Sequence, residues 1–378
     1  MNRNNDNRIV ITGTGMVTPV GLSVQSGCAA LRAGISMMNE LATHRVEGDL
    51  ITEPVVGSRV PLEWFDGEPE TEEWPGHDRF KLPEPFPKES YVASGIARIN
   101  ELALPAFFEI LSQLDFEKEP QDKTGLYIGF NEHEADVDKT VTLLQVETGI
   151  EFDPGLAFTE GRAAALMALD TAIKDINEGS INGAFVGGID SLIRTPILER
   201  LDHEGILRSA SRPQGVIPGE AGAFIYIEKM KTAVKKNRKP VATILATDCG
   251  EEPTTGSDKP NRAIGLTRVL HSVRKESGLA DPPLVVCDLN GDRYRAIEWS
   301  LAETRALGHL HGDSTTLHPA DCIGDTGAAS SMVNIIWATE AFRKEYAGSD
   351  QSLIWGASDN NKRAAAIIAS NQQIKAEV

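Results

Sequence analysis

Short apolar segments alternate with longer segments of helical periodicity along most of the chain. Runs rich in Ile, Val, Phe and Tyr predict buried strands, and apolar residues that recur every three or four positions predict amphipathic helices. In the first half, the pattern predicts strands over 8–15, 124–130, 183–193 and 222–230, and helices over 23–34 and 163–178. In the second half, it predicts strands over 240–250, 282–290 and 363–370, and helices over 262–276, 294–307 and 327–346. This alternation is typical of an α/β fold.

The helix predicted over 163–178 begins in an unusual way. Its apolar positions, from Leu166 to Ile176, have the spacing of one buried helix face. Arg162 comes just before them, in the first turn, where the positive end of the helix dipole favours an anion or a reactive thiolate over a cation. The arginine therefore indicates that this helix start does not hold a nucleophile.

The alternation of strands and helices occurs twice, which predicts two related halves. We expect them to comprise residues 1–235 and 236–378, with the boundary inside the basic segment 231–239. We interpret that segment as a solvated helix end, because runs of like charge are usually exposed.

Residues 58–92 do not follow the alternation. They contain six prolines and many acidic residues, so they predict a long irregular insertion. Its aromatic residues Trp64, Phe65, Trp74 and Phe80 admit two interpretations. They pack against the body of the protein, or they form a partner-binding arm, since long loops are often functional and tryptophans are favoured interface residues.

Charge restricts the classes of partner. The chain has 378 residues, 41% of them hydrophobic, with 37 basic and 55 acidic residues and a formal net charge of -18. Nucleic acids and anionic membranes attract basic surfaces, so neither is an expected partner. No apolar run reaches 18 residues, and the amino terminus lacks an apolar core of signal-peptide length. Four cysteines without a CxxC spacing fit a reducing cytoplasm.

Neither a cofactor nor a metal is expected. The glycines of "ITGTGMV" follow a predicted strand but do not form a GxGxxG dinucleotide motif. His309, His311 and His318 cluster in "HLHGDSTTLH", and a His-x-His pair can bind a metal ion. A third ligand at a convincing spacing is missing, so we do not assign a metal site.

Four segments in order resemble the β-ketoacyl-(acyl carrier protein) synthases, which have the thiolase fold. They are "RIVITGTGMVTPVG" (8–21), "NEGSINGAFVGGIDSLI" (177–193), "GILRSASRPQGVIPGEAGAFIYIEKMKTA" (205–233) and "IGDTGAASSMVNIIWATEAF" (323–342). The regions 22–125 and 250–280 follow the family pattern poorly. The resemblance implies a five-layered α/β/α/β/α body of two similar halves, usually a homodimer, with the helix that follows Arg162 and the strand 183–193 in the dimer face.

The resemblance also implies a catalytic cysteine and two histidines, and this sequence has none of the three. Gapless counting from the glycine pair at 187–188 places the cysteine position on Arg162. The first histidine position falls on Asn290, before Gly291. The second belongs to a Lys-x-x-x-Gly-His pattern in which the glycine is Gly324, while the histidine and lysine positions hold Asp325 and Ala320.

The substituted residues suggest a filled site. If the two halves fold as the resemblance implies, Arg162 can form an ion pair with Asp325 or with Glu160. Asp325 has a second interpretation as a cap for the amides of the next turn, which we prefer to a catalytic carboxylate. A relocated site at Cys287 is less favoured than a small buried thiol. The glycine-rich loop keeps Gly356, but it has Asp359, Asn360 and Asn361 where the family has glycines.

These observations favour a catalytically inactive protein that serves as a scaffold or adaptor for a protein partner. Degenerate proteins of this kind resemble components found beside bacterial type VI secretion effectors, which they would help to load. One alternative is a β-ketoacyl-synthase-related acyltransferase or decarboxylase with an atypical site. Another is a chain-length-factor-like subunit paired with an active ketosynthase. Fold alone does not decide among them.

Overall fold

A computed structural model describes residues 5–47, 52–61, 96–114, 116, 123–131, 137–255, 259–281, 283–310 and 314–371. The candidate partner-binding residues Trp64, Phe65, Trp74 and Phe80 lie outside these residues. The main strands are β1 (Ile9–Val17), β4 (Thr124–Gly129), β5 (Gly155–Phe158), β6 (Gly183–Ser191), β7 (Glu220–Lys229), β8 (Ala242–Glu251), β9 (Leu284–Cys287), β10 (Thr315–Leu317), β11 (Gln351–Ala357) and β12 (Lys362–Ser370). A separate ribbon consists of β2 (Asn39–Glu47) and β3 (Thr52–Gly57).

The helices cover and divide the sheet. They are α1 (Val24–Ala33), α3 (Ile96–Gln113), α4 (Val137–Thr148), α5 (Ala164–Glu178), α6 (Thr195–His203), α7 (Met230–Lys235), α8 (Ile264–Ser277), α9 (Arg293–Leu307), α10 (Ala320–Ile323) and α11 (Ser330–Arg343). Short 3₁₀ turns are η1 (Asn5–Asn7), η5 (Gly161–Ala163), η6 (Gly308–Leu310) and η7 (Gly327–Ala329). The strands and helices expected from the sequence are therefore present, and the structure adds others that were not expected, among them β5, β11, α3 and α6.

The sheet contains the same arrangement twice. Its order is β10-β9-β11-β12-β8-β1-β7-β6-β4-β5. In the first half, β4 pairs in parallel with β5 and β6, and β7 pairs antiparallel with β6 and β1. In the second half, β9 and β12 make the matching pairs with β10, β11 and β8. The two halves meet where β1 pairs with β8, and we propose that the chain boundary between them follows α7.

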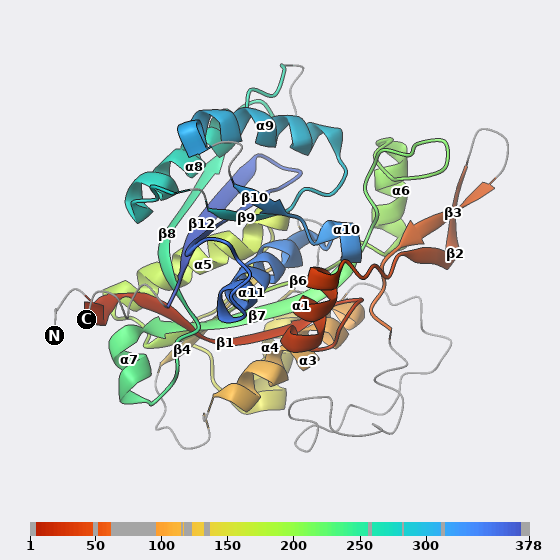
Figure 1. Ribbon diagram of the computed structural model, residues 1–378. Coiled ribbons are helices and arrows are strands. Elements are labelled where there is room, and N and C mark those ends of the chain that lie inside the picture. Colours follow the sequence, from red (N-terminus) through yellow and green to blue (C-terminus); the bar gives the residue numbers. More distant parts are fainter. Residues whose placement is uncertain are drawn as a thin grey trace.

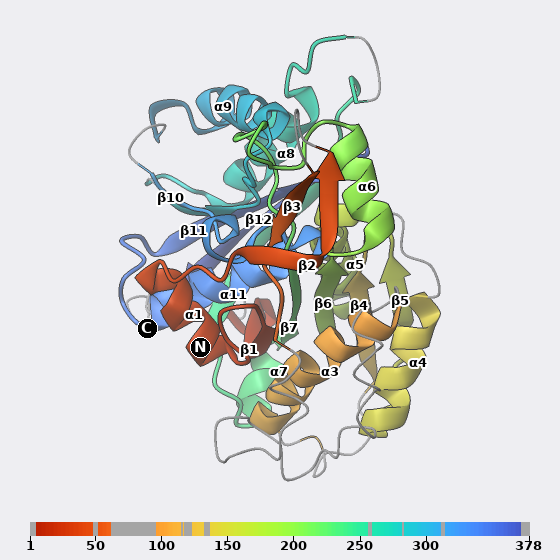
Figure 2. The same cartoon turned by 90° about the vertical axis from the view of Figure 1, so that its right-hand side faces the viewer.

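Five layers result from this repeat, as the resemblance implies. Helices α8 and α9 form one outer layer, α5 and α11 lie in the middle, and α3 and α4 form the other outer layer (Figure 1). The ribbon of β2 and β3 stands beside α6 at one side (Figure 2). One buried apolar cluster surrounds α5 and α11, and two others lie under the outer helices.

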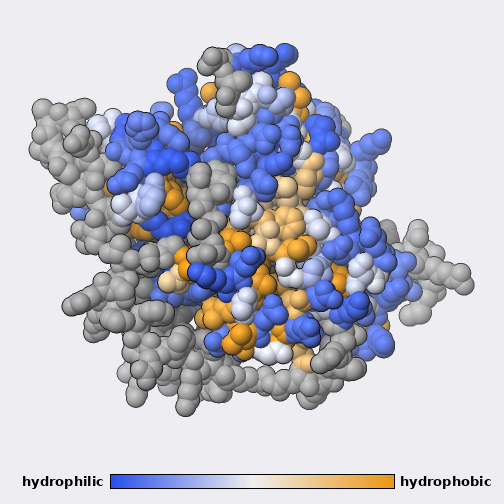
Figure 3. Space-filling view, turned by 180° about the vertical axis from the view of Figure 1, so that it is seen from behind, coloured by the Kyte–Doolittle hydropathy of each residue, from blue (hydrophilic) through white to orange (hydrophobic). Residues whose placement is uncertain are grey.

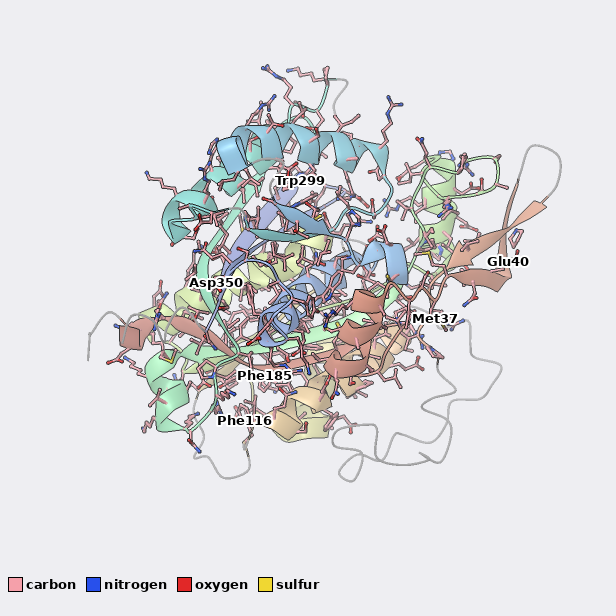
Figure 4. The ribbon with its side chains drawn as sticks, in the orientation of Figure 1. Met37, Glu40, Phe116, Phe185, Trp299 and Asp350 are labelled. Atoms are coloured by element: carbon pink, nitrogen blue, oxygen red, sulfur yellow. The ribbon has the colours of Figure 1, made fainter. Side chains whose placement is uncertain are left out.

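Aromatic side chains fill the two outer cores. Phe116 and Phe185 contact each other under α3, with ring centroids 5.4 Å apart (Figure 4). Trp299 of α9 stacks on Trp355 of β11 with centroids 5.0 Å apart. Because such rings bury large apolar areas, these contacts stabilise the packing of the outer helices on the sheet.

Candidate functional site

The starts of α5 and α11 meet at the centre of the molecule. Each helix follows a short turn, η5 or η7, and these two turns contact each other. Gly161 and Gly327 open the turns with φ values of 66° and 53°, a conformation that disfavours residues with a Cβ. At Gly327 a Cβ would also lie 1.9 Å from Asp190 Oδ2. The two glycines thus allow both helix starts to face one point.

Each helix start is capped from the other half of the molecule. The Asp190 carboxylate, near the end of β6, accepts a hydrogen bond of 3.0 Å from the amide of Ala328. The Ser358 hydroxyl, after β11, accepts one of 2.9 Å from the amide of Ala163. Helix amides that point into the site are therefore occupied by side chains of the chain itself.

Arg162 lies in η5 and is only 5% exposed. Its Nε donates to Asp325 Oδ1 at 3.2 Å, and its Nη2 donates to Asp325 Oδ2. This is the two-bonded arginine–carboxylate geometry that combines charge with direction. The expected pairing of Arg162 with Asp325 is confirmed, whereas the alternative with Glu160 is wrong. Glu160 instead accepts a hydrogen bond of 3.1 Å from the Asn360 side chain.

Asp325 binds three groups at once. Besides Arg162, it accepts a 2.6 Å hydrogen bond from the Asn290 amide and a 2.9 Å bond from the backbone amide of Gly327. The capping role expected of Asp325 is thus confirmed. Since Asn290 follows β9 and Asp325 precedes η7, the structure brings three of the substituted positions, 162, 290 and 325, into one contact network.

A second carboxylate extends the network in a way that the sequence did not reveal. Asp359, after β11, accepts 2.8 Å and 2.5 Å hydrogen bonds from Arg162 and Arg295 on the same oxygen. Arg200 of α6 approaches its other oxygen at 3.4 Å. Asp359 appeared in the sequence only as a replacement for glycine, and nothing in the local pattern indicates that three arginines converge on it.

Burial and neighbouring charge set the protonation of this network. Burial opposes ionisation of Asp325 and Asp359, but the charge of Arg162 outweighs it and lowers the pKa of both carboxyls. Burial likewise opposes the charge of Arg162, and Asp325 more than compensates, raising the pKa of Arg162. Burial raises the pKa of Asp288 to about 6, although Arg295 lies 3.7 Å away. The ion pairs therefore stay charged at neutral pH, with Asp288 closest to titration.

The other positions singled out in the sequence, Ala320, Gly324 and Gly356, make backbone contacts around the Arg162 network. Ala320 begins α10, and its carbonyl accepts the amide of Gly324 at 3.0 Å. Gly324 has a φ of 69°, and a Cβ there would lie 2.8 Å from the carbonyl oxygen of Ile217. Gly356 lies inside β11 and not in the expected loop, and a Cβ there would lie 2.8 Å from the Arg162 carbonyl. Both glycines thus allow close backbone approach around the Arg162 network.

The cluster lacks the usual groups for acyl transfer. Its side chains are those of Arg162, Asn290, Asp325, Asp359 and Arg295, and the Ser358 hydroxyl donates to the Glu160 carbonyl. None of these is a thiol or an imidazole, and a hydroxyl acts as a nucleophile only beside a base that takes its proton. The cluster consists of paired charges and contains no activated nucleophile that could form a covalent intermediate.

Cys287 and the histidines lie outside this network. Cys287 is fully buried at the end of β9, and burial raises the pKa of its thiol. That surrounding fits a small apolar side chain better than a nucleophile. His318 pairs with Asp321 at 2.7 Å. Among the described residues, no group of three or more potential ligands is placed to hold a metal ion.

A pocket of about 600 Å³ lies over the network. Most of its lining side chains are ionisable, including those of Arg200, Tyr294, Arg295, Asp359 and Arg363. Pockets that bind apolar ligands are lined mainly by apolar and aromatic side chains. The polar lining therefore suits a polar group better than an acyl chain.

Comparisons with known proteins agree on the fold. Over 97% of its length, the chain superposes on two solved structures, each covered to 99%. One is described as a type II polyketide acyl-carrier protein in complex with its ketosynthase bound to the hexaketide (TM-score 0.77, 13% identity), the other as the ishigamide ketosynthase/chain length factor (0.74, 16%). A ketosynthase domain of Streptomyces albus oxazolomycin synthesis gives 0.73 at 15% identity, with 75% of that chain covered.

Sequence relatives are distant. No family model matches the chain. A highly reducing polyketide synthase of Aspergillus fumigatus is 24% identical over 204 residues, which is 50% of this chain and 8% of that protein. A second, from a Nectria species, is 24% identical over 162 residues, 37% of this chain and 6% of that protein. The chain thus spans less than a tenth of the length of these relatives.

The comparisons establish the fold. The chain has the thiolase-like fold of ketosynthase and chain-length-factor structures, and about half of it is distantly similar in sequence to a polyketide synthase. Among the described residues, no helix combines the length and the apolar character needed to cross a bilayer.

Proposed function

We propose that this protein is a catalytically inactive ketosynthase-like subunit that acts as a scaffold or adaptor for a protein partner. The observation that supports it is the buried pairing of Arg162 with Asp325 at the start of α5. In the resembled enzymes this place would hold a thiol and an imidazole. An arginine is permanently protonated and is not a nucleophile, so the pairing replaces reactivity with a neutral structural contact.

Two classes of partner fit this proposal. One is an active ketosynthase, with this chain in the role of a chain-length factor, and similarity to a ketosynthase/chain length factor structure supports it. The other is a bacterial type VI secretion effector that the protein would help to load. Affinity purification of the tagged full chain from its native cells, followed by mass spectrometry, separates the two by the identity of the recovered protein.

We expect no covalent adduct when the purified protein is incubated with acyl- and malonyl-thioesters. Burial raises the pKa of Cys28 and Cys287, and raises that of Cys249 to about 12, so these thiols stay protonated and weakly nucleophilic at neutral pH. Intact-mass spectrometry measures the adduct, and trapping of carbon dioxide measures decarboxylation.

A paired variant makes the acylation experiment sharper. Arg162→Cys/Asp325→His places a thiol and an imidazole at the helix start, and it is expected to react with iodoacetamide faster than the wild type. Acylation or carbon dioxide release by the wild type at a rate above a thioester blank would refute the inactive assignment. The same result would favour the atypical acyltransferase or decarboxylase.

The partner face expected from the sequence needs a correction. Strand β6 covers most of the segment 183–193, and all nine of its residues are buried between β4 and β7. It is therefore not available to a second chain. The outermost strand of the first half is β5, whose Leu156 is 38% exposed. Helix α5 and β5 lie on the rear face, where apolar side chains gather across the middle of the molecule (Figures 2 and 3).

We propose that β5 is the edge through which this chain pairs with a second copy. An edge strand presents unpaired backbone groups that another strand can satisfy. Leu156→Lys is expected to weaken self-association at least about tenfold, measured by light scattering after size exclusion, because the lysine would bring a charge into the paired edge. Val234→Lys, at a 67% exposed position on α7, is the matched control. A wild-type chain that is monomeric at micromolar concentration would refute this pairing.

A further inference from the structure

Helix α8 presents a row of basic side chains on the outside of the molecule, where α8 and α9 form the outermost layer (Figure 1). Leu266, Val269, Leu270 and Val273 are buried against the sheet. Arg268, His271 and Lys275 occupy the exposed side and are spaced three or four residues apart, and the one exposed carboxylate of the helix is that of Glu276, at its carboxyl-terminal end. The spacing places them along one face over about 10 Å, at 1.5 Å per residue.

These basic side chains have no acidic partner among the described residues. Arg268 donates to the carbonyl of Cys249 at 2.6 Å, and Arg274 donates to the carbonyl of Ala306 at 2.7 Å. Neither they nor His271 and Lys275 form an ion pair with a described carboxylate. Although the chain has 55 acidic and 37 basic residues, these cations are therefore open to carboxylates of another molecule.

Some cations elsewhere on the molecule have acidic partners, whereas Lys231 and Lys235 of α7 form no ion pair with a described carboxylate. Lys174 pairs with Asp170 at 2.7 Å, and Lys362 pairs with Glu251 at 2.6 Å. These pairs form within the chain, as expected where carboxylates are abundant. The exposed face of α8 is distinguished by the spacing of its cations, which follow one another along a single helix.

Features at each end of this face give it the form of a docking surface. At the amino-terminal end, Ile264 is 47% exposed and offers an apolar contact. At the carboxyl-terminal end, a pocket of about 380 Å³ is lined by His271, Arg274, Lys275, Gly278 and Leu279. An apolar contact, a line of cations and a basic pocket follow one another along a single helix.

We propose that this face of α8 docks an acidic segment of a partner protein. Carboxylates at helical spacing on the partner would lie opposite Arg268, His271 and Lys275, and one would enter the pocket beside Arg274. Opposite potentials accelerate encounter and fix the orientation of a complex. The net charge of -18 repels extended polyanions such as nucleic acids and anionic membranes, so a short acidic protein segment fits best.

The test uses the full chain and a fluorescein-labelled helical peptide with glutamate at every third or fourth position. Fluorescence anisotropy is expected to show binding that weakens with added salt, and no binding of the same peptide with glutamine in place of glutamate. Arg268→Glu/Lys275→Glu is expected to weaken binding at least about tenfold. Lys275→Glu alone, which removes no recorded contact, is expected to weaken it to a smaller extent.

The matched control changes the same amount of charge elsewhere. Lys231→Glu/Lys235→Glu, on the exposed face of α7, is expected to leave peptide affinity within about twofold of wild type. An equal loss in both double variants would show that only net charge matters and would overturn the proposal. Equal or tighter binding of duplex DNA or phosphatidylserine vesicles would overturn it as well.

This inference does not depend on the inactive assignment. Peptide binding at α8 and acylation at α5 are measured separately, so each can fail while the other holds.

Discussion

Replacing Asp325 by alanine is expected to lower the free energy of unfolding by about 3–5 kcal/mol. Asp325 is 2% exposed and neutralises Arg162, which is 5% exposed. Removing the carboxylate leaves a buried guanidinium with Asp359 alone, and also removes the acceptor of the Asn290 amide. Denaturant titration of the purified variants at neutral pH measures the change.

A double variant separates loss of the ion pair from loss of packing. Arg162→Leu/Asp325→Leu removes both charges, and it is expected to be closer in stability to wild type than Asp325→Ala. Asp359 keeps Arg295 as a partner in that variant. If Asp325→Ala costs the same in the Arg162→Leu background as in the wild type, the two side chains are not energetically coupled.

The pH dependence gives a second check on the same residue. The pKa of Asp325 is lowered from its ordinary value of 3.8, with Arg162 outweighing the effect of burial. A lowered carboxyl pKa contributes stability that is present above the unfolded-state pKa and lost as the pH falls through the folded-state value. The stability difference between wild type and Asp325→Ala is therefore expected to shrink in acid below about pH 4.

The Arg162 network shows why local patterns revealed part of the site. Arg162, Asn290 and Asp325 stand in segments with a recognisable strand or helix start, so their convergence follows once the two halves are correctly aligned. Arg295 and Arg200 lie inside ordinary helical patterns, where charged residues normally mark a solvated face. Both arginines form ion pairs with Asp359, which is more than 60 residues away in the sequence. These contacts arise from the tertiary fold, so a local sequence pattern does not predict them.

The assignment of the partner face to the segment 183–193 came from the family resemblance. The segment is apolar apart from Asp190 and Ser191, which is equally compatible with an interface and with a strand covered on both faces. The structure selects the second possibility, because β6 pairs with β4 and β7 and all nine of its residues are buried. Strand β5 is only four residues long and gave too short a periodic signal to be recognised.

A second large loss of stability is expected on substitution of Glu220, which contacts the described residues on both sides of the range 62–95. Its carboxylate accepts hydrogen bonds from the Val60 amide at 2.8 Å, from Ser191 at 2.7 Å, and from Nε of Arg98 at 3.1 Å. Arg98 also donates to the Val60 carbonyl at 2.8 Å. Residues just before and just after the range 62–95 are thus tied to one buried charge.

Glu220→Gln is expected to cost about 3 kcal/mol of unfolding free energy, because Arg98 keeps its buried charge and loses its main counter-charge. Glu101→Gln is the matched control: it removes the 3.0 Å contact of Arg98 with a carboxylate that is 21% exposed, and it is expected to cost less than about 1 kcal/mol. Amide hydrogen exchange over residues 58–61 is expected to accelerate in Glu220→Gln alone. Equal effects of the two substitutions would contradict this assignment.

The contact between Glu220 and Arg98 depends on pH, because it requires the Glu220 carboxyl to be ionised. Burial opposes its ionisation, but Arg98 outweighs burial and lowers the pKa of Glu220 from 4.5. The Glu220 carboxylate therefore contributes stability above its unfolded-state pKa of 4.5, and this stability is lost as the pH falls through the lower folded-state pKa. The bridge of Ser58 to Gly219, and of Pro218 to Asp325, places this contact beside the Arg162 network. Acid is thus expected to weaken both the Glu220 contacts and the Arg162 network. The unfolding free energies of wild type and Glu220→Gln are expected to converge in acid, as is expected for wild type and Asp325→Ala.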